Sequence, residues 1–140
     1  MDVKGVPARL LTDAVWELVE TYIDQAIEVG GRLESTDDVR QWVIERTIQL
    51  WIVIEDEKII SAITTEIIEY PNATVCRLRH MGGRLNKVVI TKVSELVFPW
   101  AVAQGCSKVE LWGRPGWEKI GNKVLKNVRR TTVVMHGDLE

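Results

Sequence analysis

Hydrophobic positions recur along the chain at two different spacings, and the change of spacing divides it into elements. Between residues 12 and 29 apolar side chains repeat every three or four positions, which predicts an amphipathic helix that ends at Gly30-Gly31. Ser35 and Asp38 have the spacing of a capping box and predict a second helix that fades near Arg46. Runs of branched and alternating residues then predict three strands, over residues 48–54, 59–69 and 73–81. Because the connections between them are too short for parallel crossovers, these strands should form an antiparallel meander.

Helical and extended patterns alternate in the remaining third of the chain. The predicted elements are a helix over 88–104 in which Pro99 introduces a kink or a late start, a strand over 107–112, a short helix over 116–126 and a last strand over 128–136. A strand–helix–strand unit makes a right-handed parallel crossover, so 73–81 and 107–112 should be parallel neighbours. The pattern therefore predicts one α/β (α+β) domain over residues 1–140, with a mixed sheet, element order ααβββαβαβ and helices on both faces.

Composition narrows the class of protein. Apolar residues make up 46% and charged residues 27% of the 140 positions, as in globular proteins. No apolar run approaches the roughly 20 residues of a membrane-spanning helix, and residues 1–11 lack the apolar core of a signal peptide. A cytoplasmic location is expected, with Cys76 and Cys106 as buried free thiols and with no metal site.

The net charge of −2 conceals a strong polarity along the chain. Residues 10–57 carry 12 acidic and 3 basic side chains, whereas residues 71–135 carry 12 basic and 3 acidic ones. Either the basic half binds an anionic partner, or the two halves neutralise each other within the fold. Lys119, Lys123 and Lys126 should share one face of the predicted helix 116–126, although few aromatic residues accompany them, which makes nucleic acid an unlikely partner.

Gly82 and Gly83 stand between a predicted strand and a predicted helix. Two glycines permit close approach of the backbone, and a helix N-terminus presents unpaired N–H groups and partial positive charge. Arg79, Arg84 and Lys87 add full charges nearby. The segment 82–87 is thus predicted to bind an anion, the alternative being that the glycine pair only ends a strand.

The element order, together with Arg79 and Gly82 at their relative spacing, resembles the GNAT superfamily of N-acyltransferases. The resemblance implies acetyl-coenzyme A as cofactor, with its thioester between strands 73–81 and 107–112. Arg84 departs from the family pattern, which has a small residue there, and the initial strand of the family is missing or reduced to residues 3–9. The resemblance implies that the pyrophosphate is held by Arg79, Met81, Gly82, Gly83, Arg84 and Lys87.

Two stretches near the C-terminus are similar to small GNAT-like proteins of tailed bacteriophages. They are Ala103-Gln104-Gly105-Cys106 and the run from Val109 to Lys119. Some of those proteins resemble virion components, so the resemblance implies a location in the host cytoplasm or in a virion. It also leaves open a non-enzymatic structural or interaction protein, for which the partner surface is expected to include Trp42, Trp112, Arg114 and Trp117.

An N-acyltransferase needs a base for the unknown amine acceptor and often an acid for the leaving thiolate. The candidate bases are His80, Glu66 and Glu110. In the family the acid is commonly a tyrosine on the helix that corresponds to 116–126, and this helix has none. The two tyrosines of the chain, Tyr22 and Tyr70, are expected to be structural.

Overall fold

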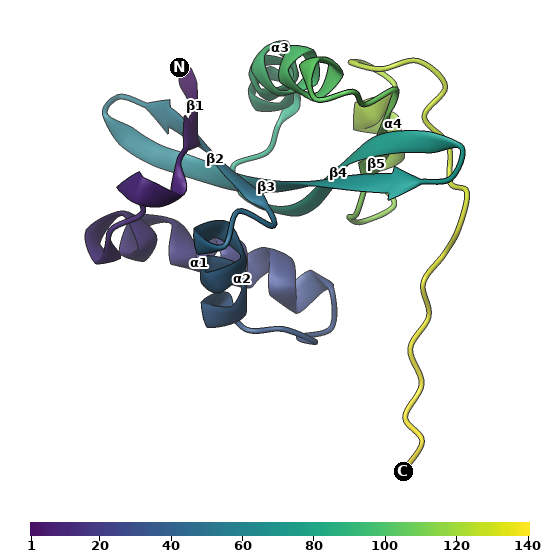
Figure 1. The fold of residues 1–140 in the computed structure, drawn as a ribbon, viewed down its shortest axis with the longest axis horizontal. Helices are drawn as coiled ribbons and strands as arrows, with labels where there is room; N and C mark the ends of the chain where they lie inside the picture. The colour runs from purple at the N-terminus through teal and green to yellow at the C-terminus, as the bar shows by residue number, and fades with distance from the viewer.

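A five-stranded mixed sheet runs through the molecule in the order β1-β2-β3-β4-β5 (Figure 1). The computed structural model describes all residues 1–140, and its strands are β1 (Asp2–Val6), β2 (Gln49–Glu55), β3 (Lys58–Tyr70), β4 (Ala73–Gly83) and β5 (Lys108–Leu111). The first four strands pair antiparallel with their neighbours, and β5 pairs parallel with β4. The predicted meander and the predicted parallel crossover are both confirmed.

Helices cover both faces of the sheet, which confirms the predicted class (Figure 1). On one face α1 (Asp13–Val29) and α2 (Thr36–Ile44) pack Ile23 and Val39 against Leu50 of β2. On the other face α3 (Lys87–Ala103) packs Val93 against Val53 and Ile63. Pro99 lies inside α3 without ending it. None of the helices combines the length and the apolar character needed to cross a membrane.

The helix starts follow from local sequence. Thr12 accepts a hydrogen bond from the Val15 N–H, and the predicted capping box of Ser35 and Asp38 is formed. Asn86 caps α3 by accepting from the Val89 N–H. A side-chain oxygen at this position satisfies one of the orphan N–H groups of the first turn, which fixes where each helix begins.

Two predictions at the ends of the chain are wrong. Residues 128–136 form no strand, and α4 is limited to Trp117–Gly121 instead of spanning 116–126. Lys123 and Lys126 lie beyond α4, so the three lysines do not share a helix face. The initial strand, expected to be missing or reduced to residues 3–9, is present as β1 over residues 2–6 and precedes a 3₁₀ turn, η1 (Ala8–Leu10).

The expected glycine loop at 82–86 is also different, because β4 continues through Gly83. Gly82 pairs with Ala62, and Gly83 pairs with Ser61. A Cβ on Gly82 would lie 1.8 Å from the Tyr22 carbonyl oxygen, so glycine at this position lets α1 lie directly on β4. Gly82 therefore serves helix–sheet packing, whereas Gly83 has a positive φ of 92° and lies against the backbone of Ile60 and Ser61. The connection to α3 is reduced to residues 84–86.

Candidate functional site

A β-bulge in β4 creates the local geometry of the site. Thr64 of β3 pairs with His80 and the next residue, Thr65, pairs with Leu78, so Arg79 is the extra residue. Leu78 packs in the apolar cluster under α3, whereas Arg79 and His80 both reach Glu34, just before α2. The parallel pairing with β5 ends at Leu78, and β4 runs on to Gly83 without it. The bulge thus lies where the two strands part.

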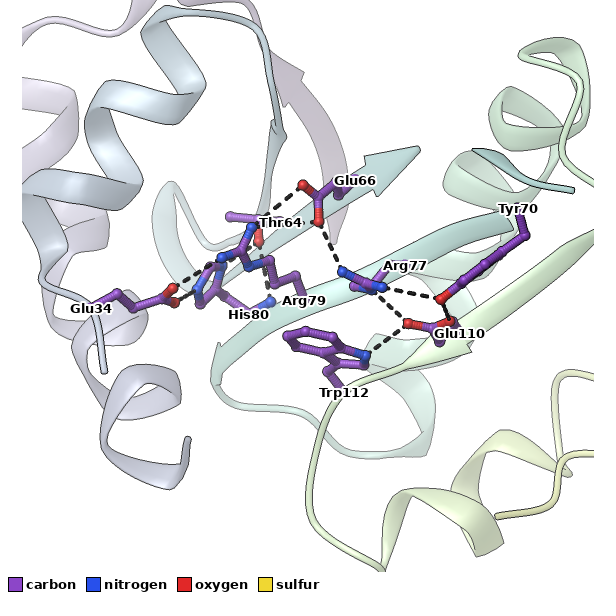
Figure 2. Close-up of polar contacts among 9 residues, drawn as sticks. All are labelled: Glu34, Thr64, Glu66, Tyr70, Arg77, Arg79, His80, Glu110 and Trp112. Atoms are coloured by element: carbon purple, nitrogen blue, oxygen red, sulfur yellow. Dashed lines mark hydrogen bonds and ion pairs between the residues drawn. The ribbon is translucent and has the colours of Figure 1, made fainter. Parts of the chain in front are cut away.

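His80 is buried in a chain of hydrogen bonds that runs from Thr64 to Glu34 (Figure 2). Thr64 Oγ1 accepts from the His80 main-chain N–H at 3.1 Å and lies 2.6 Å from Nδ1, while Nε2 contacts Glu34. Because the Glu34 carboxylate only accepts, a neutral imidazole donates to it from Nε2–H, and Nδ1 is left to accept from the Thr64 hydroxyl. Burial lowers the pKa of His80 although Glu34 opposes the shift, so the imidazole is neutral at pH 7.

Two arginines of β4 link three carboxylates into one network (Figure 2). Arg79 donates to Glu34 at 3.1 Å and to Glu66 at 3.4 Å. Arg77 donates to Glu66 at 3.2 Å and also to Glu110 of β5. With His80 neutral, the two arginines and three carboxylates together carry a net charge of −1.

Indole rings flank the same arginines. The Arg79 guanidinium lies 4.6 Å from the ring centre of Trp42, and that of Arg77 lies 4.1 Å from the ring centre of Trp112. Guanidinium groups stack on aromatic faces by cation–π attraction. Each arginine is therefore held both by carboxylates and by an indole.

Glu110, one of the predicted bases, accepts hydrogen bonds from three side chains. It accepts from Tyr70 and from the Trp112 indole N–H, both at 2.8 Å, in addition to Arg77. Burial alone would raise its pKa, but the hydrogen bonds from Tyr70 and Arg77 outweigh burial and lower it. A carboxylate with a lowered pKa is a weak proton acceptor, so Glu110 is better suited to holding Arg77 and Trp112 in place.

The N-terminus of α3 keeps free hydrogen-bond donors. The main-chain N–H groups of residues 85–88 donate to no protein acceptor, and the side chain of Lys87 is exposed beside them. Arg84 forms an ion pair with Glu55 and is half exposed. The Gly83 N–H donates to the Gln25 side chain at 3.0 Å and is not free.

The other predicted cofactor contacts lie elsewhere. Arg79 belongs to the carboxylate network described above, and Gly82 faces the backbone of α1. Met81 lines a small apolar cavity of about 20 Å³ between β4, β5, α3 and α4. The six residues predicted to hold the pyrophosphate are thus not gathered at one place, and those beside the free N–H groups of α3 are Arg84 and Lys87.

The residues of the predicted partner surface have different surroundings. Trp42 and Trp112 stack on arginines, whereas Trp117 lines the small apolar cavity together with Phe98 of α3. Arg114 is exposed in the turn before α4.

Both cysteines are free and buried, as predicted. Burial raises the pKa of the Cys76 thiol to about 12. A thiol with so high a pKa is not a nucleophile at neutral pH, which leaves Cys76 a core residue.

The sequence pattern missed Glu34 and Thr64. Glu34 lies in the polar run before α2, and its one distinguishing feature is its position next to the capping box. Thr64 is a buried position of β3, and the strand pattern there does not distinguish it from its buried neighbours. Their roles depend on the bulge, which brings His80 between them.

Comparison with solved structures identifies the fold. No protein-family model matches the sequence, and no curated protein is significantly similar to it. An aminoglycoside acetyltransferase from an uncultured soil metagenomic sample superposes with a TM-score of 0.71 at 7% identity, over 99% of this chain and 96% of the other. A ribosomal-protein-alanine N-acetyltransferase from Brucella melitensis superposes with a TM-score of 0.68 at 10% identity, over 98% and 100%.

An aminoglycoside 6'-N-acetyltransferase from Acinetobacter haemolyticus gives a TM-score of 0.64 at 13% identity, with both chains covered completely. The chain therefore has the fold of the GNAT acetyltransferases over its whole length. At these identities the similarity concerns the fold alone.

Proposed function

We propose that this protein is an N-acyltransferase that uses acyl-coenzyme A and transfers its acyl group to an amine. One observation carries the proposal: the bulge at Arg79 parts β4 from β5 and places a carboxylate–imidazole pair there, within a fold similar to N-acetyltransferases along its whole length. That arrangement supports an acyl donor on the α3 side of the sheet and an amine on the α1–α2 side.

The residues at the start of α3 fit the anionic end of an acyl-coenzyme A. Four free N–H groups over residues 85–88 and the exposed Lys87 ammonium would hold its phosphates, with Arg84 released from Glu55. When bound, acyl-coenzyme A supplies an acyl group activated as a thioester. Arg79, Gly82 and Gly83 have no part in this contact.

Glu34 is the residue that we assign to proton transfer. It is the solvent-accessible member of the pair, with its side chain 20% exposed against 3% for His80. A proton taken from the amine stays on the Glu34 carboxyl group, which the Nε2–H of His80 holds in place, and Thr64 fixes the orientation of the imidazole. Glu66 and Glu110 hold Arg77 and Arg79 and thereby set the net negative charge that favours an ammonium group.

Thermal unfolding with acetyl-coenzyme A tests the binding step. Ligand at a thousand times its dissociation constant should add about 4 kcal/mol of stability. We expect Lys87→Ala to weaken this binding about tenfold, because one phosphate contact is lost. Lys92→Ala is the matched control: Lys92 is exposed on α3 beyond its first turn and should leave binding unchanged.

Thiol release in the presence of amines tests turnover. Aminoglycosides and peptides with N-terminal alanine are the first acceptors to try, since the similar structures include acetyltransferases of these kinds. Glu34→Gln should abolish thiol release while acetyl-coenzyme A still raises the melting temperature. Stabilisation without any turnover would leave a coenzyme A-binding protein without catalysis, and no stabilisation would overturn the proposal as a whole.

A further inference from the structure

A cavity of about 320 Å³ lies at the β1 edge of the sheet, between η1 and the connection from α2 to β2. Cavities that bind small molecules begin at about 300 Å³. Val6, Val43 and Ile48 are among its apolar lining residues. None of the lining residues belongs to the carboxylate network or to the start of α3, so the cavity is separate from the candidate active site.

The polar side chains that line the cavity are hydrogen-bond donors without a protein acceptor. The guanidinium groups of Arg9 and Arg46 are exposed and form neither an ion pair nor a side-chain hydrogen bond. Gln49 Oε1 accepts from the Thr65 hydroxyl at 2.8 Å, which leaves the Gln49 NH₂ group free to donate. Guanidinium and amide N–H groups are donors that suit a carboxylate.

Arg46 lacks a carboxylate partner although its part of the chain is strongly acidic. Residues 10–57 carry 12 acidic and 3 basic side chains. The other two basic residues, Arg32 and Arg40, each form an ion pair with an aspartate of α1. Glu45, the neighbour of Arg46 in the chain, accepts instead from a side-chain amide of α2. The Arg46 guanidinium therefore stays available to an anion from solution.

The backbone at Arg46 has a conformation that favours glycine. Its φ is 66°, in the left-handed region. Arg46 follows the C-cap of α2, and the next N–H, that of Thr47, donates to the Trp42 carbonyl oxygen at 2.9 Å, as in a Schellman motif. Glycine is the usual residue at such a position because it has no Cβ to strain. What arginine adds there is its guanidinium group.

We propose that this cavity binds a small organic carboxylate with an apolar chain. The carboxylate would accept from Arg9, Arg46 and the Gln49 NH₂ group, and the chain would lie against the apolar lining. An inorganic anion would leave that lining uncovered, and a neutral apolar molecule would leave both guanidinium groups unused. The inference is independent of the proposed catalysis, because it uses no residue assigned to acyl transfer.

Titration of the ¹⁵N-labelled full chain with sodium hexanoate at constant ionic strength tests the site. A ligand of this size should bind in the millimolar range, so the titration extends to about 20 mM. We expect amide shifts gathered in residues 6–10 and 43–49. Acetate should bind at least about tenfold more weakly, because each buried CH₂ group contributes about fourfold. Phosphate that binds as tightly as hexanoate, or hexanoate shifts confined to residues 85–88, would overturn the proposal.

Arg46→Gly separates binding from folding. Since its backbone suits glycine, the variant should keep the melting temperature of the parent, while its affinity for hexanoate falls about tenfold. Arg9→Ala should weaken binding to a similar extent. Arg32→Gly is the matched control, because Arg32 also has a positive φ, of 55°, and does not line the cavity. Full affinity in Arg46→Gly, or an equal loss in Arg32→Gly, would contradict the assignment.

Discussion

Gly82 lies where α1 rests on β4, and the space beside its Cα is filled by main chain. A methyl group would stand 1.8 Å from the Tyr22 carbonyl oxygen, a backbone atom that cannot turn aside. Gly82→Ala should therefore lower the free energy of unfolding by about 3 kcal/mol or more, measured by urea denaturation. Gly116→Ala is the control, because no atom lies within 4 Å of the added carbon and its φ is −58°. Equal stability of the two variants would show that α1 does not pack as described.

His80 should make stability depend on pH. Its folded pKa is lowered by burial from 6.5, so below pH 6.5 the unfolded chain binds a proton that the folded chain does not. The free energy of unfolding should thus fall as pH drops from 7 toward the folded pKa. Measurements kept above pH 4.5, which is the ordinary pKa of Glu110, separate this effect from the protonation of that carboxylate.

His80→Gln should flatten the dependence, as measured by denaturation at several pH values. His136→Gln changes an exposed histidine and should preserve the slope of the parent protein. A slope that stays the same in His80→Gln would contradict a neutral buried imidazole.

At the scale of elements, the start of α2 connects helix capping with the site. Ser35 forms the capping box, and the preceding residue, Glu34, contacts both Arg79 and His80. Ser35→Ala should cost about 1 kcal/mol of stability, whereas Ser35→Asp should recover most of it because aspartate is an equally good cap. Comparison of the two denaturation midpoints checks this. If Ser35→Asp is no better than Ser35→Ala, the loss does not come from the cap.

The sequence predicted those elements whose signal is local. The periodicity of residues 12–29, the box at Ser35 and the alternation in 73–81 each depend on neighbours in the chain, and these elements are present. The sequence left open whether an initial strand forms, because a five-residue run with Lys4 and Gly5 gains its stability from pairing with β2. The glycines at 82 and 83 were interpreted as a break in the strand. Gly82 instead serves a contact with α1, and Gly83 has a positive φ beside the backbone of β3, neither of which a local pattern encodes.

The candidate site was predictable only in part for the same reason. His80, Glu66 and Glu110 do lie in or beside one network, but their partners come from distant segments and from the bulge at Arg79. The predicted anion-binding segment 82–87 overlaps the free N–H groups of residues 85–88 only in part, because β4 continues to Gly83 whereas the strand was expected to end at Met81.

At the scale of the whole molecule, the charge polarity of the sequence is in part resolved inside the fold. Glu34 and Glu55, from the acidic half, form ion pairs with Arg79 and Arg84 of the basic half. Mutual neutralisation thus accounts for part of the polarity. Other basic side chains near the C-terminus, including those of Arg114 and Lys119, are exposed and have no ion-pair partner.

The two apolar layers share the strands of one sheet, and this should make unfolding a single event. Along β2, Leu50 and Ile52 belong to the layer under α1 and α2, while Trp51 and Val53 belong to the layer under α3. Loss of either layer exposes the same backbone, so neither should persist alone. With 5-fluorotryptophan incorporated, the ¹⁹F signals of Trp16 and Trp51 report one layer each and should disappear at the same urea concentration.

Truncations in the two layers sharpen that expectation. Val19→Ala and Val93→Ala remove buried methyl groups on opposite faces of the sheet, and each should cost about 2 kcal/mol. Because the layers are coupled through the strands, either substitution should lower the urea concentration at which both fluorine signals disappear, and by the same amount. If Val93→Ala moved the Trp51 transition and left that of Trp16 in place, the α3 layer would be unfolding by itself, and the sheet would not be the common element that the shared strands imply.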